Sequence, residues 1–222
     1  MRMESTQLLR AQEQTALKDQ HRQEILDAGM ALCLEKGVAE VEMKDVATAA
    51  RVSRATLYRY FPSKKALIYE ILRHQAAEKT AGYHTDRQAF SGNGHAKFSQ
   101  FVAQLVDAYV HFPELYRFMG MVDFYYGTHD APEELMLLYR EVFGGLLVED
   151  TPHLYLEEGQ QDGSVRADLD PRIYTATVIA TLVSLSEQVA ANREATQLLY
   201  GLARAEVLIE TAAQALLHAA QA

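Results

Sequence analysis

Apolar residues recur every three or four positions along most of the chain, and runs of alternating β-branched residues are missing. This spacing is typical of amphipathic α-helices, because residues three and four apart share one helix face. In the first clear example Ile25, Ala28 and Leu32 share a face, and Gly37 provides a favourable C-terminal stop. The pattern predicts a helix over about 21–36, with a backward extension left open, and an all-α fold of about nine helices.

Two short helices are predicted next, over 43–50 and 54–60, with a short turn between them. Ser53 lies where its side chain can cap the second of these helices. The Pro-Ser pair that follows ends that helix and caps another, expected over 64 to about 84. Two short helices joined by a three-residue turn have the geometry of a helix-turn-helix.

The remainder of the chain is interpreted as helices joined by irregular segments. The Gly- and Asn-containing stretch 90–94 and the stretch 160–171 are expected to be connections. Further helices are expected from about 98 to Pro113, and over about 114–127, 132–150, 171–191 and 194–219.

Charge is distributed unevenly over the 222 residues. The chain has 21 Lys and Arg against 30 Asp and Glu, a net charge of -9. Residues 81–222 account for -11, whereas 44–65 carry six basic side chains and one acidic side chain. A small basic module on an acidic body suggests a segment that binds a polyanion, with a solvated helix face as the plainer alternative.

Composition excludes several other classes of protein. A single cysteine, Cys33, excludes an internal disulfide framework, and we expect neither a metal site nor a cofactor. No run of about 18 apolar residues is apparent, so no membrane span is expected. The N-terminal residues 1–20 lack the apolar core of a signal peptide, so we expect a cytoplasmic protein.

The side chains of the predicted helix-turn-helix fall into two groups. Val46, Ala47, Ala50 and Leu57 are apolar or small where the two helices must seal against the first helix. The outward residues of the second helix combine cations, a hydroxyl and a phenol, which suit phosphates and base edges: Arg54, Ala55, Thr56, Tyr58 and Arg59.

These residues carry a resemblance to a known family. Lys44-Asp45-Val46-Ala47, Val52-Ser53-Arg54-Ala55-Thr56-Leu57-Tyr58-Arg59-Tyr60-Phe61 and Ser63-Lys64-Lys65-Ala66-Leu67 resemble the N-terminal domain of TetR/AcrR-type transcriptional regulators. The resemblance implies an all-α homodimer whose helix-turn-helix domains bind a palindromic operator on double-stranded DNA. It also implies that a small molecule in the C-terminal domain releases the DNA.

Two positions depart from the family pattern. Arg51 stands in the turn where the family often has Gly, at a backbone position expected to need a positive φ. Glu42 precedes the first short helix where the family often has a capping Ser or Thr. Carried over residue by residue, the resemblance implies these DNA contacts: Lys44, Ser53, Arg54, Ala55, Thr56, Tyr58, Arg59, Tyr60 and Lys64. Arg59 is the best candidate for reading a base, and Tyr60 could equally be a core phenol.

Aromatic residues are concentrated in one part of the body. Of the 20 Phe and Tyr residues, 13 fall within 83–143. Aromatic and Met side chains between helices suit a small-molecule pocket, although any helical core contains them. Asp123 among aromatics would suit a cationic, aromatic effector, with an exposed helix residue as the alternative. Residues that could line a pocket for a hydrophobic or aromatic effector are Phe98, Phe101, Tyr116, Met119, Asp123, Phe124, Tyr126, Tyr139 and Phe143.

The last two predicted helices have narrow stripes of apolar or small residues. Such stripes suit helix packing in a two-fold seam between subunits, although periodicity alone leaves an internal core equally open. The candidate dimerisation residues are Ile173, Ala176, Thr177, Ala180, Leu198, Leu202, Ala205, Ile209, Ala212 and Leu216.

The sequence thus predicts an N-terminal extension (1–20), a helix-turn-helix domain (21–68) and a ligand-binding and dimerisation domain (69–222). The function expected is a sequence-specific repressor released by a small molecule. A regulator whose body responds to a protein partner, or to no ligand, is the alternative. An enzyme is disfavoured, because no phosphate loop, zinc-protease motif or nucleophile elbow is present.

Overall fold

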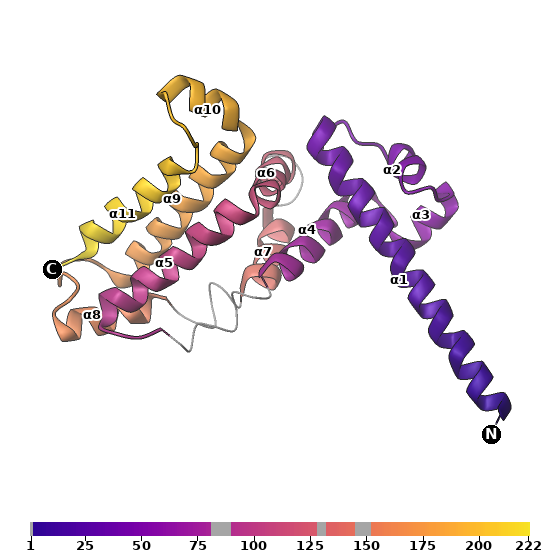
Figure 1. The fold of residues 1–222 in the computed structure, drawn as a ribbon, viewed down its shortest axis with the longest axis horizontal. Helices are drawn as coiled ribbons and strands as arrows, with labels where there is room; N and C mark the ends of the chain where they lie inside the picture. Colours follow the sequence, from indigo (N-terminus) through magenta and orange to yellow (C-terminus); the bar gives the residue numbers. More distant parts are fainter. Residues whose placement is uncertain (1, 81–89, 128–131, 145–151) are drawn as a thin grey trace. The chain divides into compact units, whose positions relative to one another are not determined.

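The computed structural model describes residues 2–80, 90–127, 132–144 and 152–222 (Figure 1). Within these ranges the chain forms eleven α-helices, one short π-helical segment and no strand beyond an isolated bridge between Val165 and Gln221. The all-α expectation is confirmed. The chain divides into two compact units, here called the head (Met1–His74) and the body (Gln75–Ala222).

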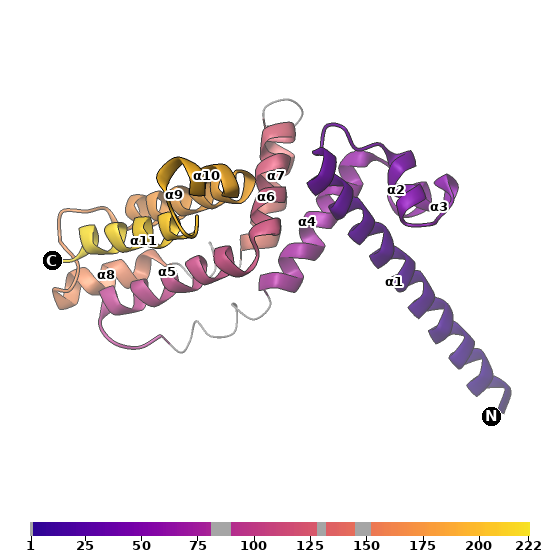
Figure 2. The ribbon, with the colours of Figure 1, turned by 45° about the horizontal axis from the view of Figure 1, so that its top comes forward.

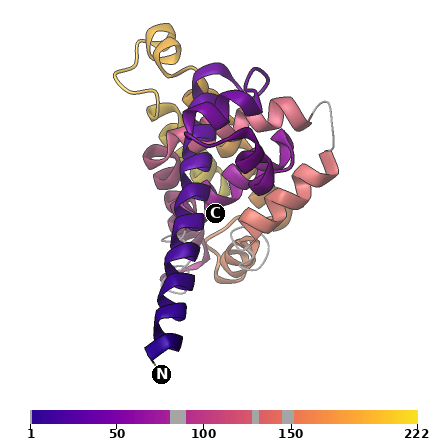
Figure 3. The same cartoon turned by 90° about the vertical axis from the view of Figure 1, so that its right-hand side faces the viewer.

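The head is built on one long helix. Helix α1 (Arg2–Lys36) is a rod, and α2 (Met43–Ala49) and α3 (Arg54–Tyr60) lie beside its C-terminal part (Figures 2 and 3). Helix α4 (Lys64–Thr80) starts in the head. Helix α1 continues backwards far beyond residue 21, where the apolar periodicity first becomes clear.

The core of the head is formed by residues that the apolar pattern selects. Ile25 and Leu26 of α1, Val46 of α2, Leu57 of α3 and Ile68 of α4 have no exposed surface. A partly buried ion pair also connects the first and last helices, since the Arg22 guanidinium of α1 contacts the Glu70 carboxylate of α4. The head is therefore held by one small apolar core that fixes α2 and α3 against α1.

The body contains the remaining helices. They are α5 (Gly94–His111), α6 (Pro113–Val122), the π-helical η2 (Asp123–Gly127), α7 (Pro132–Gly144), α8 (His153–Asp162), α9 (Pro171–Ala191), α10 (Arg193–Tyr200) and α11 (Val207–Ala220). Helices α5, α9 and α11 lie side by side in Figures 1 and 2. Helix α9 also packs against α6, α8 and α10, so it is the central helix of the body.

Two glycines allow α5 and α8 to approach closely. A Cβ atom on Gly94 would collide with the backbone of Gly159 and Tyr155, and a Cβ atom on Gly159 would collide with Val165. Both glycines are buried. This contact fixes the N-terminal end of α5 against the last turns of α8.

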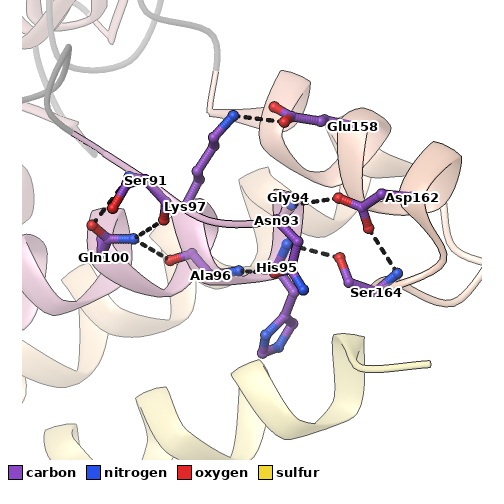
Figure 4. Close-up of polar contacts among 10 residues, drawn as sticks. All are labelled: Ser91, Asn93, Gly94, His95, Ala96, Lys97, Gln100, Glu158, Asp162 and Ser164. Carbon is purple, nitrogen blue, oxygen red and sulfur yellow. Dashed lines mark hydrogen bonds and ion pairs between the residues drawn. The ribbon is translucent and has the colours of Figure 1, made fainter.

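Polar contacts reinforce the same junction (Figure 4). The Gly94 amide donates to the Asp162 carboxylate at 2.8 Å, and the His95 amide donates to the Ser164 hydroxyl at 3.1 Å. Lys97 forms an ion pair with Glu158 at 2.6 Å. Hydrogen bonds from Ser164 and from the Gly94 amide hold the pKa of Asp162 below its ordinary value. Asp162 and Ser164 thus each satisfy one amide group at the start of α5 that has no partner within that helix.

Several predicted boundaries in the body differ from the structure. The helix expected over 132–150 is described only to Gly144, and α8 was not predicted. The ends predicted at about 84 and at 150 lie outside the described residues. The final helix expected over 194–219 is two helices, because Gly201 adopts a left-handed conformation (φ 65°). The Leu202 amide donates to the Gln197 carbonyl across this break at 2.9 Å, which is a regular way to end a helix.

Helix α9 is more apolar than the sequence analysis recognised. Of the described residues, it is the one helix long and apolar enough to cross a membrane by length and composition, and only 28% of that stretch is buried in the protomer. Its contacts with α6, α8, α10 and α11 are those of a core helix in a helical body. The unburied apolar part of α9 therefore faces either a cavity or the surface.

Candidate functional site

The turn between α2 and α3 depends on an unusual backbone conformation. Arg51 has φ 56°, the positive value expected at this position, and it is the one residue other than Gly with a positive φ in the described chain. The Val52 amide donates to the Ala47 carbonyl at 2.9 Å and closes the turn. An arginine in this region stores about 1 kcal/mol of strain, which the packing of α2 and α3 must outweigh.

The start of α3 is fixed by a side-chain cap. The Ser53 hydroxyl accepts a hydrogen bond from the Thr56 amide at 3.0 Å, and the two hydroxyl oxygens lie 2.9 Å apart. Leu57 points inwards and is fully buried, whereas Phe61 is buried just after the helix. The orientation of α3 in the head is thus set by one cap and one buried residue, which determine its outward side.

The outward side of α3, here called the α3 face, consists of Arg54, Ala55, Thr56, Tyr58 and Arg59. All are exposed except Thr56, which is half-buried. Neither arginine forms an ion pair with any described residue, and α3 contains no acidic residue. The Arg59 guanidinium lies 5.7 Å from the centre of the Tyr60 ring. Two cations, a hydroxyl and a phenol are therefore available on one rigid surface.

The other three candidates for DNA contact are engaged in the head itself. Lys44 is exposed and forms an ion pair with Glu42 at 2.7 Å, while Glu42 makes no side-chain cap to α2. The Lys64 ammonium donates to the Ala39 carbonyl at 2.8 Å, and burial lowers its pKa. Tyr60 is half-buried and its hydroxyl points to the Lys18 carbonyl at 3.4 Å. Lys64 and Tyr60 thus support the fold of the head, and the α3 face does not include them.

A cavity of about 700 Å³ lies within the body. It is surrounded by α5, α6, η2, α7, α9 and the start of α8, and its walls are mainly apolar. The size falls in the range of small-molecule sites in proteins. The lining residues are Leu105, Tyr109, Tyr116, Met119, Asp123, Met136, Tyr139, Arg140, Phe143, Pro152, His153, Arg172, Thr175, Ala176, Ile179, Ala180, Val183 and Glu187.

Five of the nine predicted pocket residues lie on this cavity: Tyr116, Met119, Asp123, Tyr139 and Phe143. The other four do not. Phe98 and Phe101 are buried in the core on α5, with ring centres 6.0 Å apart, and Tyr126 is also buried. Phe124 is 75% exposed, because it lies on the outer side of the π-helical turn. The aromatic-rich segment therefore contains both core residues and cavity residues, and the spacing of aromatic residues in the sequence does not distinguish these two groups.

Two carboxyl groups give the cavity an acidic region. The Tyr139 hydroxyl donates a hydrogen bond to Asp123, and burial raises the pKa of Asp123 while this bond partly opposes the rise. Burial, and then the nearby charge of Asp123, raise the pKa of Glu187 to about 7. Burial and Glu187 also raise the pKa of Tyr109. The Glu187 carboxyl therefore changes its charge close to neutral pH.

Three buried polar atoms on the cavity wall lack a hydrogen-bond partner. They are Oε1 of Glu187, Oγ1 of Thr175 and Nε2 of His153. The nearest acidic oxygen to His153 belongs to Glu157, at 3.9 Å, beyond hydrogen-bond distance. Leaving such atoms unpaired costs about 1–3 kcal/mol each. A bound molecule with complementary groups would remove that cost.

Most residues on the α9 side of the cavity were not predicted from sequence. Arg172, Thr175, Ile179, Val183 and Glu187 were not predicted to lie there. One signal was present, since Glu187 is the one charged residue between Ile173 and Asn192. A single carboxyl group in a long apolar helix indicates a polar environment within the fold.

The predicted dimerisation residues are divided between three environments. Ala176 and Ala180 line the cavity, although both retain exposed surface. Ala205 and Ile209 are buried within the protomer, so they are unavailable for a seam between subunits. The remaining residues are exposed (Ile173, Thr177 and Leu198) or half-buried (Leu202, Ala212 and Leu216). The stripe read from 198 to 216 does not exist as one helix face, because the chain breaks at Gly201.

Comparison with known proteins identifies the head. Residues 25–71 match the family model described as bacterial regulatory proteins, tetR family. This segment comprises the C-terminal part of α1, the α2–turn–α3 unit and the start of α4. It therefore includes the complete α3 face.

Two curated relatives and one solved structure extend the comparison. The chain is 42% identical over 73 residues to the HTH-type transcriptional repressor KstR of Mycobacterium tuberculosis, which covers 33% of this chain and 32% of the relative. It is 27% identical over 171 residues to the repressor KstR2 of Rhodococcus jostii, which covers 70% and 73%. The structure of the transcriptional regulator FadR from Bacillus subtilis in complex with stearoyl-CoA superposes with a TM-score of 0.61 and 17% identity, over 89% of this chain and 98% of that one.

These similarities differ in what they cover. The chain spans about a third of the length of the first curated relatives that it matches. The likeness over the body is one of fold. The chemistry of an effector must therefore be inferred from the residues that line the cavity of this chain.

Proposed function

Because residues 25–71 match the tetR family model, we propose that this chain is a TetR-type repressor that binds an inverted-repeat operator as a homodimer. A small, mainly apolar molecule in the body cavity then releases the DNA. The chain is a DNA-binding transcriptional regulator and not an enzyme. It acts in the cytoplasm, where its operator is.

The α3 face is the observation that carries the DNA-binding proposal. Arg54 and Arg59 are exposed on a short helix whose orientation is fixed, and neither forms an ion pair with a described residue of the head. Arginine can donate two hydrogen bonds to a guanine edge, and Thr56 and Tyr58 can contact phosphates or bases. We assign base readout to Arg59 and backbone contacts to Arg54 and Arg51.

Dimerisation follows from the size of the α3 face. A seven-residue helix contacts too few bases to specify a site alone, whereas two copies about 34 Å apart read two half-sites in successive major grooves. Exposed apolar residues suit the required seam, namely Ile173 on α9 and the run Leu198, Leu199 and Tyr200 on α10. Their exposed fractions range from 59% to 84%.

The cavity favours a small-molecule effector over a protein partner. A volume of about 700 Å³ with mainly apolar walls and three unpaired polar atoms suits a ligand of drug-like size. The FadR structure, whose fold resembles that of this chain, was solved in complex with stearoyl-CoA. Helix α4 includes residues of both the head and the body, so it can transmit occupancy of the cavity.

The decisive experiment measures operator selection and affinity. The purified protein is mixed with a random duplex pool, bound sequences are selected, and the best duplex is titrated by fluorescence anisotropy at several salt concentrations. We expect an inverted repeat to be enriched. Replacing Arg59 (Arg59→Ala) should weaken binding to it by about 1–3 kcal/mol and relax the preference at one base position of each half-site.

The control is Arg204→Ala, the same chemical change at an exposed body residue that pairs with Glu210. It should leave operator affinity unchanged. Enrichment of no sequence, or equal losses for both variants, would refute recognition by the α3 face. Ligand and operator must also weaken each other by the same factor if the cavity controls DNA release.

A further inference from the structure

The two ends of the cavity proposed above as the effector site carry different polar groups. Its longest continuous wall is one face of α9, formed by Arg172, Thr175, Ile179, Val183 and Glu187 together with two alanines. Because an α-helix rises 1.5 Å per residue, Thr175 and Glu187 are separated by about 18 Å along this wall. The residues between them on the wall are all apolar. The order of residues along α9 therefore places Arg172 and Thr175 at one end of the cavity wall and Glu187 at the other.

The C-terminal end of this wall is acidic and aromatic. Gly120 on α6 lies opposite Glu187, since a Cβ added at Gly120 would lie only 3.3 Å from the Glu187 Cβ, and Asp123 follows one turn later. The charge of Asp123 acts on Glu187, and neither carboxyl group forms an ion pair with a described residue. The rings of Tyr109 and Tyr116 meet edge to face at 4.3 Å beside them. Carboxylates next to aromatic rings attract ammonium groups and other hydrogen-bond donors.

The N-terminal end of the wall has the opposite character. Arg172 lies in the first turn of α9, lines the cavity and forms no ion pair in the described part of the chain. Thr175, one turn further, is 94% buried and its hydroxyl has no partner. Asp170 is close in sequence, but its carboxylate accepts the amides of Arg172 and Ile173 and does not line the cavity. A guanidinium beside an unpaired hydroxyl suits a carboxylate.

We propose that the cavity takes an elongated apolar molecule with unlike polar ends, with a carboxylate at Arg172 and Thr175 and an amine or other donor at Asp123 and Glu187. This inference rests on the proposed function for its biological meaning, since it names the class of effector. The preference of the protein for a two-ended ligand can be measured without DNA. The apolar middle of the molecule lies against Ile179 and Val183.

The test uses three probes with the same alkyl chain: hexadecylamine, hexadecanoate and ω-aminohexadecanoate, each below its micelle-forming concentration. Titration calorimetry with the full-length protein measures their affinities. We expect the two-ended probe to bind at least about tenfold more tightly than either one-ended probe, since each charge-assisted hydrogen bond contributes about 1.5–3 kcal/mol. Equal affinities for all three would overturn the proposal.

Variants assign the two ends. Glu187→Gln should weaken the amine and the two-ended probe by about tenfold while leaving hexadecanoate unchanged, and Arg172→Gln should do the reverse. Arg172 is exposed, so its variant tests the proposal even if Glu187→Gln fails to fold. The control is Glu194→Gln, at an exposed carboxyl on α10 outside the cavity. A uniform loss for all probes in either variant would indicate a structural role and would contradict the assignment.

The two proposals fail in distinguishable ways. Tight binding of the two-ended probe without release of the operator would refute effector control and leave the ligand class intact. Release of the operator by a probe that ignores Arg172 and Glu187 would support the function and refute the ligand class.

Discussion

The Tyr139 hydroxyl on α7 donates a hydrogen bond to the Asp123 carboxylate at the start of η2. This bond connects two elements that lie on either side of a segment outside the described residues. It also opposes the effect of burial on the pKa of Asp123. Helix α7 is thereby tied to the acidic end of the cavity by a polar contact.

Removing this bond should destabilise the body and further raise the pKa of Asp123. We expect Tyr139→Phe to lower the free energy of unfolding by about 1–2 kcal/mol, because the bond is charge-assisted and partly buried. Chemical denaturation at neutral pH gives the value. Tyr200→Phe is the matched control, since Tyr200 is 59% exposed, and it should be neutral. An unchanged stability for Tyr139→Phe would mean that the bond contributes nothing in solution.

Glu187 should make the stability of the protein depend on pH. Its pKa is about 7 in the folded protein against 4.5 for an ordinary Glu, so between these values the folded state holds a proton that the unfolded state has lost. Stability therefore falls as pH rises through this window, by about 1–2 kcal/mol after allowance for partial solvent screening. Thermal melts from pH 4 to 8 measure the slope.

In Glu187→Gln the neutral amide removes this proton linkage, so the melting temperature should fall less steeply with rising pH over the same range. Glu194→Gln, at an exposed carboxyl on α10 outside the cavity, should retain the slope of the parent protein. Parallel pH profiles for the parent protein and Glu187→Gln would rule out a raised pKa at Glu187.

Gly94 should tolerate no side chain. Replacing glycine by alanine inside a helix ordinarily stabilises it by about 0.5–1 kcal/mol. At Gly94 the added methyl group meets the backbone of Gly159, so Gly94→Ala should instead destabilise the body by about 1–3 kcal/mol. Gly127→Ala is the control, because its added Cβ would have an ordinary contact with Leu135 at 3.8 Å. A stabilised Gly94→Ala would show that α5 and α8 can separate at no cost.

Arg51 allows backbone strain to be separated from charge. Arg51→Gly and Arg51→Ala both remove the cation, but only glycine adopts φ 56° without a steric penalty. The glycine variant should therefore be more stable than the alanine variant by about 1 kcal/mol. Both should lose operator affinity equally if the guanidinium contacts a phosphate. Equal stabilities would show that the turn relaxes away from the positive φ.

Local signals were sufficient to predict the head. The Ser53 cap, the Pro-Ser pair after α3 and the small Ala47 at the crossing each act within a few residues, so the order α2–turn–α3 could be read from sequence. Even the unusual backbone of Arg51 could be expected, because the turn needs a positive φ. The bond from Lys64 to the Ala39 carbonyl was not predicted, since it depends on how the loop after α1 folds back.

The body was harder to predict, because its site depends on packing between distant segments. Ala176 and Ala180 are small, which suits a tight helix contact and a cavity wall equally well. Phe98 and Tyr116 are both aromatic and buried, yet only Tyr116 reaches the cavity. The apolar spacing continues through Gly201, so it does not predict the break between α10 and α11 that the left-handed conformation of Gly201 makes.

Glu187 interrupts the apolar run of α9 near its C-terminal end, whereas Arg172 stands in the first turn. A symmetric diamine or diacid would have one favourable and one repelled terminus in whichever direction it entered. In a ligand that is wider at one end, exchanging the amine and the carboxylate would likewise change the fit, because the wide end would then lie at the other end of the cavity. The wall formed by α9 can therefore distinguish head from tail in a molecule, and not only length or bulk.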